Sequence, residues 1–237
     1  MAAPTFDKGE AATPGAGYPG PSSLTQSFTV VGAGSADFLA AFPGWISSAA
    51  SRSVDSMTYA AAALTEVAAS EIENSVSPTW RGVGAWYKDS PATGANNLVV
   101  TMSGTCRVLG MGYQSWNVGA ASARSGVTTN TGTTQNAPLT ISSDTDSVVI
   151  GCFVLEAGGN SFICNDTQRF EWFEEITWGA GGNGGSIAGG ASVTLDWDSG
   201  STTREWAATG YSLKAAGAAA FIKMVGNNFR LAGCGGL

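Results

Sequence analysis

The stretch Val193-Thr194-Leu195-Asp196-Trp197-Asp198 alternates apolar and polar side chains. Successive side chains of a β-strand point to opposite faces of its sheet. Val193, Leu195 and Trp197 would therefore face a core, while the three residues between and after them face solvent. The stretch predicts a half-buried β-strand.

Strand-like segments recur on both sides of this stretch at short, fairly regular spacing, with Gly, Asn, Asp and Pro between them. The segment 56–69 is ambiguous, because the alanines at 60–63 favour a helix, but its strand-like surroundings favour strands. The sequence shows no alternation of strand-like and helix-like segments. This rhythm predicts an all-β fold, a single β-sandwich or jelly-roll-like domain over 24–216. The strand-like segments are 27–31, 38–46, 80–87, 98–103, 107–116, 139–142, 148–155, 170–178, 191–197 and 206–213.

Three segments lie outside this pattern. Residues 1–23 are rich in Pro and Gly and predict an extended arm, either a disordered tail or a strap across a neighbouring subunit. Residues 118–138 are small and polar and predict a long loop. Residues 217–237 form an apolar tail that would supply an extra hairpin or a second contact surface.

Charge is scarce and negative. Charged residues make up 12% of the 237 residues, about half the usual share, and the net charge is −7. Because interface cores are poor in charge, we expect protein partners to cover much of the surface. An acidic chain repels phosphate, so no nucleic-acid partner is expected. The longest apolar runs are too short to cross a bilayer, so no membrane partner is expected either.

The amino terminus lacks the basic start and apolar stretch of a secretory signal, which favours assembly in a cytoplasm. The cysteines are Cys106, Cys152, Cys164 and Cys234, and no two of them form a C-x-x-C pair. We interpret all four as thiols, with a disulfide left open.

The chain contains no histidine. This excludes Ser-His-Asp and Cys-His nucleophiles and every histidine-dependent metal site. We therefore expect no catalytic residue and no cofactor. A partial calcium-loop pattern at 196–201 lacks the distant glutamate, and alternation already explains Asp196 and Asp198.

Paired carboxylates remain the best enzymatic alternative, because glycoside hydrolysis needs only two of them. The candidates are Glu171, Glu174 and Glu175, with Trp172 and Trp178 as platforms for sugar rings. In the competing interpretation the aromatic rings pack inward and the acids face solvent.

Aromatic side chains outside or beside the predicted strands are candidates for contacts between subunits. Among eight tryptophans, Trp116 is the best exposed candidate, since it lies beside the long polar segment. The predicted interface residues are Phe6, Tyr18, Trp116, Phe221 and Phe229.

Three segments carry a resemblance to a known family: 54–67, 85–101 and 206–214. They contain Asp55-Ser56-Met57-Thr58-Tyr59, a Trp86-Tyr87 pair followed by Pro91 and Gly94, and a closing Tyr211-Ser212-Leu213-Lys214. Together they resemble phage-encoded β-sandwich domains of virion accessory proteins, over about residues 25–216. The resemblance implies a role in decorating capsids or in tail and fibre assemblies, and it implies no catalytic residue.

These observations lead to one expected function and two alternatives. We expect a structural virion protein, a capsid decoration or cement protein assembled in the host cytoplasm. Its partners would be the major capsid protein or tail proteins, and it would be a homo-oligomer, with a trimer suggested by analogy. The alternatives are a tail, baseplate or fibre component, and a carbohydrate-binding or glycan-degrading module.

Overall fold

The computed structural model describes residues 3–16, 20–31, 37–48, 50–76, 78–118, 123–156, 163–174, 180–198 and 204–214. Within these ranges the regular structure consists of β-strands, and every strand pairing is antiparallel. The all-β prediction is therefore confirmed. The predicted C-terminal tail lies outside the described residues.

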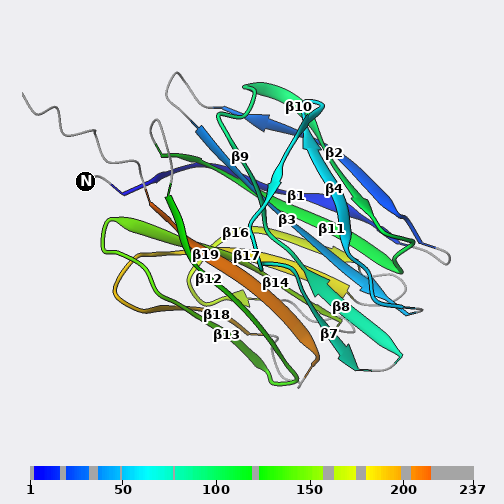
Figure 1. The fold of residues 1–237 in the computed structure, drawn as a ribbon. Helices are drawn as coiled ribbons and strands as arrows, with labels where there is room; N and C mark the ends of the chain where they lie inside the picture. Colours follow the sequence, from blue (N-terminus) through cyan, green and yellow to red (C-terminus); the bar gives the residue numbers. More distant parts are fainter. Residues whose placement is uncertain are drawn as a thin grey trace, which may run out of the picture.

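The strands form four sheets, which we name by their position (Figure 1). Outer sheet 1 has the order β2 (Ser23–Val30), β10 (Gly94–Met102), β4 (Val54–Tyr59), β5 (Ala62–Ala63). Inner sheet 1 has the order β1 (Thr5–Ala16), β11 (Val108–Asn117), β3 (Asp37–Ser47), β8 (Thr79–Val83), β7 (Ile72–Val76), with β9 (Trp86–Asp89) pairing with β3 and β6 (Thr65–Glu66). Inner sheet 2 has the order β12 (Ala123–Gly132), β19 (Trp206–Lys214), β14 (Ser147–Glu156), β17 (Ala180–Ala188), β16 (Thr167–Glu174). Outer sheet 2 has the order β13 (Asn136–Ile141), β18 (Val193–Asp198), β15 (Ile163–Cys164).

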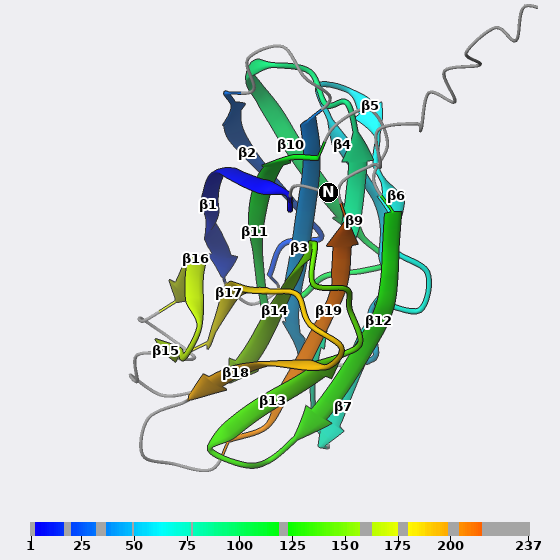
Figure 2. The same ribbon diagram turned by 90° about the vertical axis from the view of Figure 1, so that its left-hand side faces the viewer.

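The four sheets stack as layers with an apolar core in each of the three spaces between them (Figure 2). One core lies between outer sheet 1 and inner sheet 1, a second between the two inner sheets, and a third between inner sheet 2 and outer sheet 2. This arrangement is consistent with β-sandwich packing. It differs from the single sandwich predicted over 24–216, because the layers number four.

Central strands of the inner sheets, such as β3, β11 and β14, are buried on both faces, which explains their almost continuous apolar sequences. In β3, Phe38 and Phe42 enter the core between the inner sheets, while Leu39 and Trp45 enter the core towards outer sheet 1. The same alternation in β14 divides its side chains between two cores. Strands of the outer sheets bury one face only, as β18 does with Leu195 and Trp197. The predicted alternation at 193–198 is confirmed.

The two halves of the chain use the same strand order. In the first half, β1, β11 and β3 are neighbours in one sheet, and β2, β10 and β4 in the other. In the second half, β12, β19 and β14 are neighbours in one sheet, and β13, β18 and β15 in the other. In each half the first strand pairs with the last and the second pairs with the next to last. The sequence contains no obvious repeat, so this correspondence appears only in the topology.

The amino-terminal segment corrects the predicted arm. Residues 5–16 form β1, which pairs along its length with β11 of the same chain. Pro14 lies within a register shift between Ala12 and Gly15, and β1 is an edge strand of its sheet. A proline cannot donate a ladder hydrogen bond, so an edge position with a bulge is where it is tolerated. The composition therefore excluded a central strand without excluding an edge strand.

Two further segments differ from expectation in detail. The polar stretch predicted as a loop over 118–138 contributes β12 and β13, because pairing with the apolar strands β19 and β18 compensates for its lack of apolar residues. The alanines at 60–61 form the turn between β4 and β5, with φ of 51° and 62°. The strands predicted over 56–69 are confirmed.

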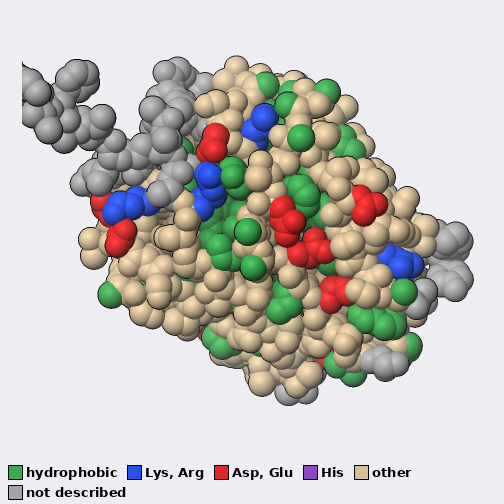
Figure 3. All heavy atoms as spheres, in the orientation of Figure 1, with side chains coloured by type: hydrophobic (Ala, Val, Ile, Leu, Met, Phe, Trp, Pro, Cys, Tyr) green, Lys and Arg blue, Asp and Glu red, His purple; other side chains and the backbone are tan. Residues whose placement is uncertain are grey.

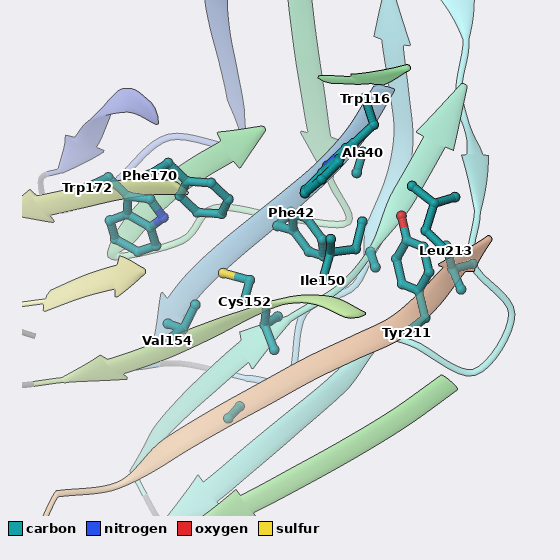
Figure 4. Packing of buried hydrophobic residues seen from close by; sticks show 14 of the residues in the cluster. Ala40, Phe42, Trp116, Ile150, Cys152, Val154, Phe170, Trp172, Tyr211 and Leu213 are labelled. Carbon is teal, nitrogen blue, oxygen red and sulfur yellow. The ribbon is translucent and has the colours of Figure 1, made fainter. Parts of the chain in front are cut away.

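Two aromatic rings of β16 fill the space between the inner sheets (Figure 4). A Cβ atom on Gly112 of β11 or Gly184 of β17 would overlap the ring of Phe170. A Cβ atom on Gly182 would lie 2.5 Å from the Trp172 ring. Glycines on both inner sheets thus leave the room in which these rings lie, and a side chain there would push the sheets apart.

Candidate functional site

Phe6 and Trp116, two of the predicted interface residues, contact each other across β1 and β11. Their ring centroids are 5.2 Å apart in an edge-to-face arrangement. The guanidinium of Arg169 lies 3.9 Å from the centroid of Phe6 and 5.2 Å from that of Trp116, and its Nε donates to Ser186 Oγ at 2.7 Å. Burial lowers the pKa of Arg169. This cluster attaches the edge strand β1 to β16 of the opposite sheet.

The prediction that Trp116 is exposed is wrong. Its side chain is 2% exposed, and its Nε1 donates to Gln114 Oε1 at 3.2 Å. Trp116 is the next-to-last residue of β11, and the even-numbered side chains of this strand face inner sheet 2. Its place beside a polar segment therefore did not imply exposure. Phe6 is half-buried against the same core. Tyr18, Phe221 and Phe229 lie outside the described residues.

On the carboxylate strand β16 the predicted sugar platform Trp172 is not at the surface. Trp172 and Phe170 are buried between the inner sheets, whereas Glu171 is exposed. The interpretation with aromatic rings inward and acids outward therefore holds for these three residues. Glu175 and Trp178 lie outside the described residues.

The partial calcium pattern on β18 is explained by hydrogen bonds. Asp196 Oδ2 accepts from Asn165 Nδ2 at 2.9 Å, and Asp198 Oδ1 accepts from Gln135 Nε2 at 3.1 Å. Within the described ranges, no three acidic or cysteine side chains come together as metal ligands would. The described ranges also contain no helix of the length and apolarity that a membrane span requires.

Three cysteines are buried thiols. Cys106, Cys152 and Cys164 are free and buried, while Cys234 lies outside the described residues. Burial raises the pKa of Cys106 to about 12 and that of Cys164 to about 11, and raises that of Cys152 further. Because the thiolate is the reactive form, these cysteines are chemically inert packing residues.

An open, polar hollow of about 600 Å³ lies at the turn between β13 and β14. Lys214 Nζ is 2.7 Å from Asp144 Oδ2 and 3.1 Å from Asp146 Oδ1 at its wall. The hydrogen bonds that Lys214 donates to Asp144 and Asp146 raise the pKa of Lys214. Ligand pockets are usually concave and mostly apolar, and this hollow is neither enclosed nor apolar.

One carboxyl group has a strongly shifted pKa. Burial, with help from the charges of Glu66, Glu73 and Asp55, raises the pKa of Glu71 to about 7. Its Oε2 accepts from the backbone N–H of Val54 at 3.3 Å. The neighbouring Glu73 accepts from Trp45 Nε1 at 2.7 Å and from the N–H of Arg52 at 2.9 Å. These hydrogen bonds hold residues 52–54, at the start of β4, against Glu71 and Glu73 at the start of β7.

Many of the scarce charges are used inside the molecule. Arg81 of β8 forms ion pairs with Glu156 and Glu205, and Arg107 lies 3.2 Å from Glu156, so a half-buried cluster joins the two halves. Sequence reasoning missed this cluster and Arg169, because isolated charges in a sequence do not reveal partners far along the chain. Figure 3 shows one face of the molecule, where Lys and Arg and Asp and Glu side chains form small separate groups among uncharged atoms.

The outward face of outer sheet 1 carries no charged residue at its paired positions. Buried and outward side chains alternate along β2 and β10, and cross-strand partners share a face, whereas a bulge in β4 leaves both Asp55 and Ser56 exposed. The outward residues, which we call the neutral face, are Ser23, Thr25, Ser27, Thr29, Ala95, Asn97, Val99, Thr101, Ser56 and Thr58.

No family model, no curated protein and no solved structure matches the chain. The candidate site is therefore defined by the geometry and chemistry of the chain itself.

Proposed function

We propose that the protein is a structural component of a bacteriophage particle, a capsid decoration or cement protein that acts through protein–protein contacts. The observation that carries the proposal is the neutral face, ten outward positions on three paired strands without a charge. A contact limited to these ten positions would desolvate no charged side chain among them, which lowers the cost of association, although the exposed Asp55 at the bulge of β4 lies beside them.

The doubled strand order supports the virion class. We infer that each half of the chain is jelly-roll-like, because the first and last strands are neighbours in one sheet and the second and next-to-last strands in the other. Jelly rolls are common in viral capsid and lectin domains. The resemblance of 54–67, 85–101 and 206–214 to phage accessory domains supports a role in capsid decoration or in tail and fibre assemblies.

In this proposal the protein assembles in the host cytoplasm as a homo-oligomer and binds the major capsid protein. Contact area then adds up over many copies and strengthens the shell. A tail, baseplate or fibre position would use the same chemistry with tail proteins as partners. The carbohydrate-binding alternative loses one of its two predicted sugar platforms, because Trp172 is buried and cannot stack on a sugar ring.

Co-sedimentation tests the proposal. Particles produced by the genome that encodes this chain would be purified without the protein, mixed with the purified protein, and separated on a density gradient. We expect the protein to move with full capsids at saturable stoichiometry. Introducing Asn97→Lys and Thr58→Lys on the neutral face should abolish binding, whereas Thr194→Lys on outer sheet 2 serves as the matched control. A protein that stays at the top of the gradient with capsids and with isolated tails would contradict the proposal.

A further inference from the structure

Strand β2 is an edge of outer sheet 1. It pairs with β10 over eight consecutive residue pairs, from Ser23 opposite Thr101 to Val30 opposite Gly94, without a register shift. Among the described residues no strand pairs with its other side. An edge of this kind presents a row of backbone N–H and C=O groups that can pair with another strand.

The other described edge strands have features that hinder such pairing. Strand β1 has two register shifts, Pro14 and charged side chains, and β16 has a register shift with Arg169 and Glu171. Strand β12 is bulged, and β13 contains Pro138. Strand β7 is short and bonded through Asn74 to inner sheet 2, and β5, β6 and β15 have two residues each.

Strand β2 has none of these features. Its sequence, Ser-Leu-Thr-Gln-Ser-Phe-Thr-Val over 23–30, contains no charge, no proline and no glycine. Proteins protect long exposed edges by charge, proline, bulges or shortness. The contrast within one molecule indicates that this edge is left open for a partner strand.

We propose that the β2 edge pairs in antiparallel fashion with β2 of a second copy of this chain. A two-fold axis that runs between the two β2 strands, perpendicular to the sheet, places residues of the same face opposite each other. Within the Ser and Thr row Ser27 then lies opposite Ser27 of the partner strand, and half-buried Leu24 lies opposite the apolar Val30 of the partner strand. The cross-strand hydroxyl pair Thr140 and Thr194, 2.8 Å apart, is an example of the hydroxyl contact that such a row can make.

This pairing has two consequences. The two four-stranded outer sheets join into one continuous sheet, and the neutral face doubles in extent. The contact is isologous, so it makes pairs of molecules rather than the trimer suggested by analogy. The inference rests on the edge strand alone and does not depend on which particle the protein binds.

The pairing is tested by light scattering after size-exclusion chromatography of the full-length chain. We expect a mass of twice 24.0 kDa for the unaltered chain. Ser27→Lys places like charges on facing strands, so the dissociation constant should rise about tenfold or more. Asn97→Lys is the matched control, because Asn97 is exposed beside Ser27 on the paired strand but not on the edge. This control should remain dimeric.

A Ser27→Cys variant tests the geometry independently of stability. Oxidation should give a covalent dimer that the unaltered chain does not form, and thermal unfolding would verify that each variant is folded. A monomeric unaltered chain, or a dimer that Ser27→Lys leaves intact, overturns the inference. A dimer lost on deletion of 215–237 but not with Ser27→Lys also overturns it, in favour of the C-terminal segment. A monomer that binds capsids overturns only this inference, whereas a dimer that binds no particle overturns only the proposed function.

Discussion

Replacing Gly112 by alanine should destabilise the fold by forcing the inner sheets apart. A Cβ atom at this position would overlap the Phe170 ring, far inside the 3.4 Å at which ordinary van der Waals contact begins. The ring cannot retreat, because the backbone of Gly184 lies close on its other side, so close that a Cβ atom there would also overlap the ring. Overpacking typically costs about 1–3 kcal/mol, and a confined ring places this site at about 3 kcal/mol.

A double-mutant cycle isolates the contact. Phe170→Ala alone should cost about 3–5 kcal/mol through the cavity that it leaves. In the Gly112→Ala, Phe170→Ala double variant the added methyl group enters that cavity, so the double loss should fall short of the sum by about 2 kcal/mol or more. The free energies of unfolding would be measured by urea titration with tryptophan fluorescence.

Gly94→Ala is the control for the cycle. A Cβ atom there meets nothing within 4 Å, but the backbone φ is +84°, so only a conformational cost of about 1 kcal/mol is expected. Its effect should add to that of Phe170→Ala. Additive free energies for the Gly112 and Phe170 pair would refute the packing between the inner sheets.

Three further outcomes are expected. Because the pKa of Glu71 is raised to about 7 in the folded state, its contribution to the free energy of unfolding is fully present below about pH 4.5 and is lost as pH rises through 7. The half-buried carboxyl reduces the effect to about 1–2 kcal/mol, so Glu71→Gln should flatten the pH dependence of urea unfolding between pH 5 and 8; an unchanged slope contradicts the assignment. Arg81→Met should cost about 3 kcal/mol in the same assay, because it removes the Arg81 ion pairs of the half-buried Glu156 and Glu205 and leaves Glu156 with Arg107 alone. Asp89→Asn should cost under about 1 kcal/mol, and equal losses would count against the cluster. A thiol reagent at pH 8 should modify Cys106, Cys152 and Cys164 only after denaturation. Fast modification of any of these three in the native protein would disagree with their burial.

The strands were predictable because their signal is local. Alternation at 193–198 and the apolar runs at 38–46 and 148–155 depend on neighbouring residues only. Those runs also contained the sign of four layers, since continuous apolar strands are typical of sheets buried on both faces. Pro43 hid it in β3. The strand changes partner there, from β9 at 38–41 to β8 at 44–47, so the missing N–H is tolerated.

The partners of individual side chains were not predictable. Trp116 is buried because β1 and Arg169 cover it, and both contacts join segments far apart in sequence. The polar strands β12 and β13 exist because apolar partners pair with them, which no property of 118–138 encodes. The neutral face was implied by the low charge content, but its position required the register of β2, β10 and β4.

The most direct test of the proposed function is the copy number of this chain in purified particles. Quantitative mass spectrometry of gradient-purified particles from the encoding genome would give the ratio of this chain to the major capsid protein. A decoration protein that stabilises the shell should be present at a fixed ratio of many copies per particle. Its absence from particles, together with its recovery as a free protein in the lysate, would contradict a virion role.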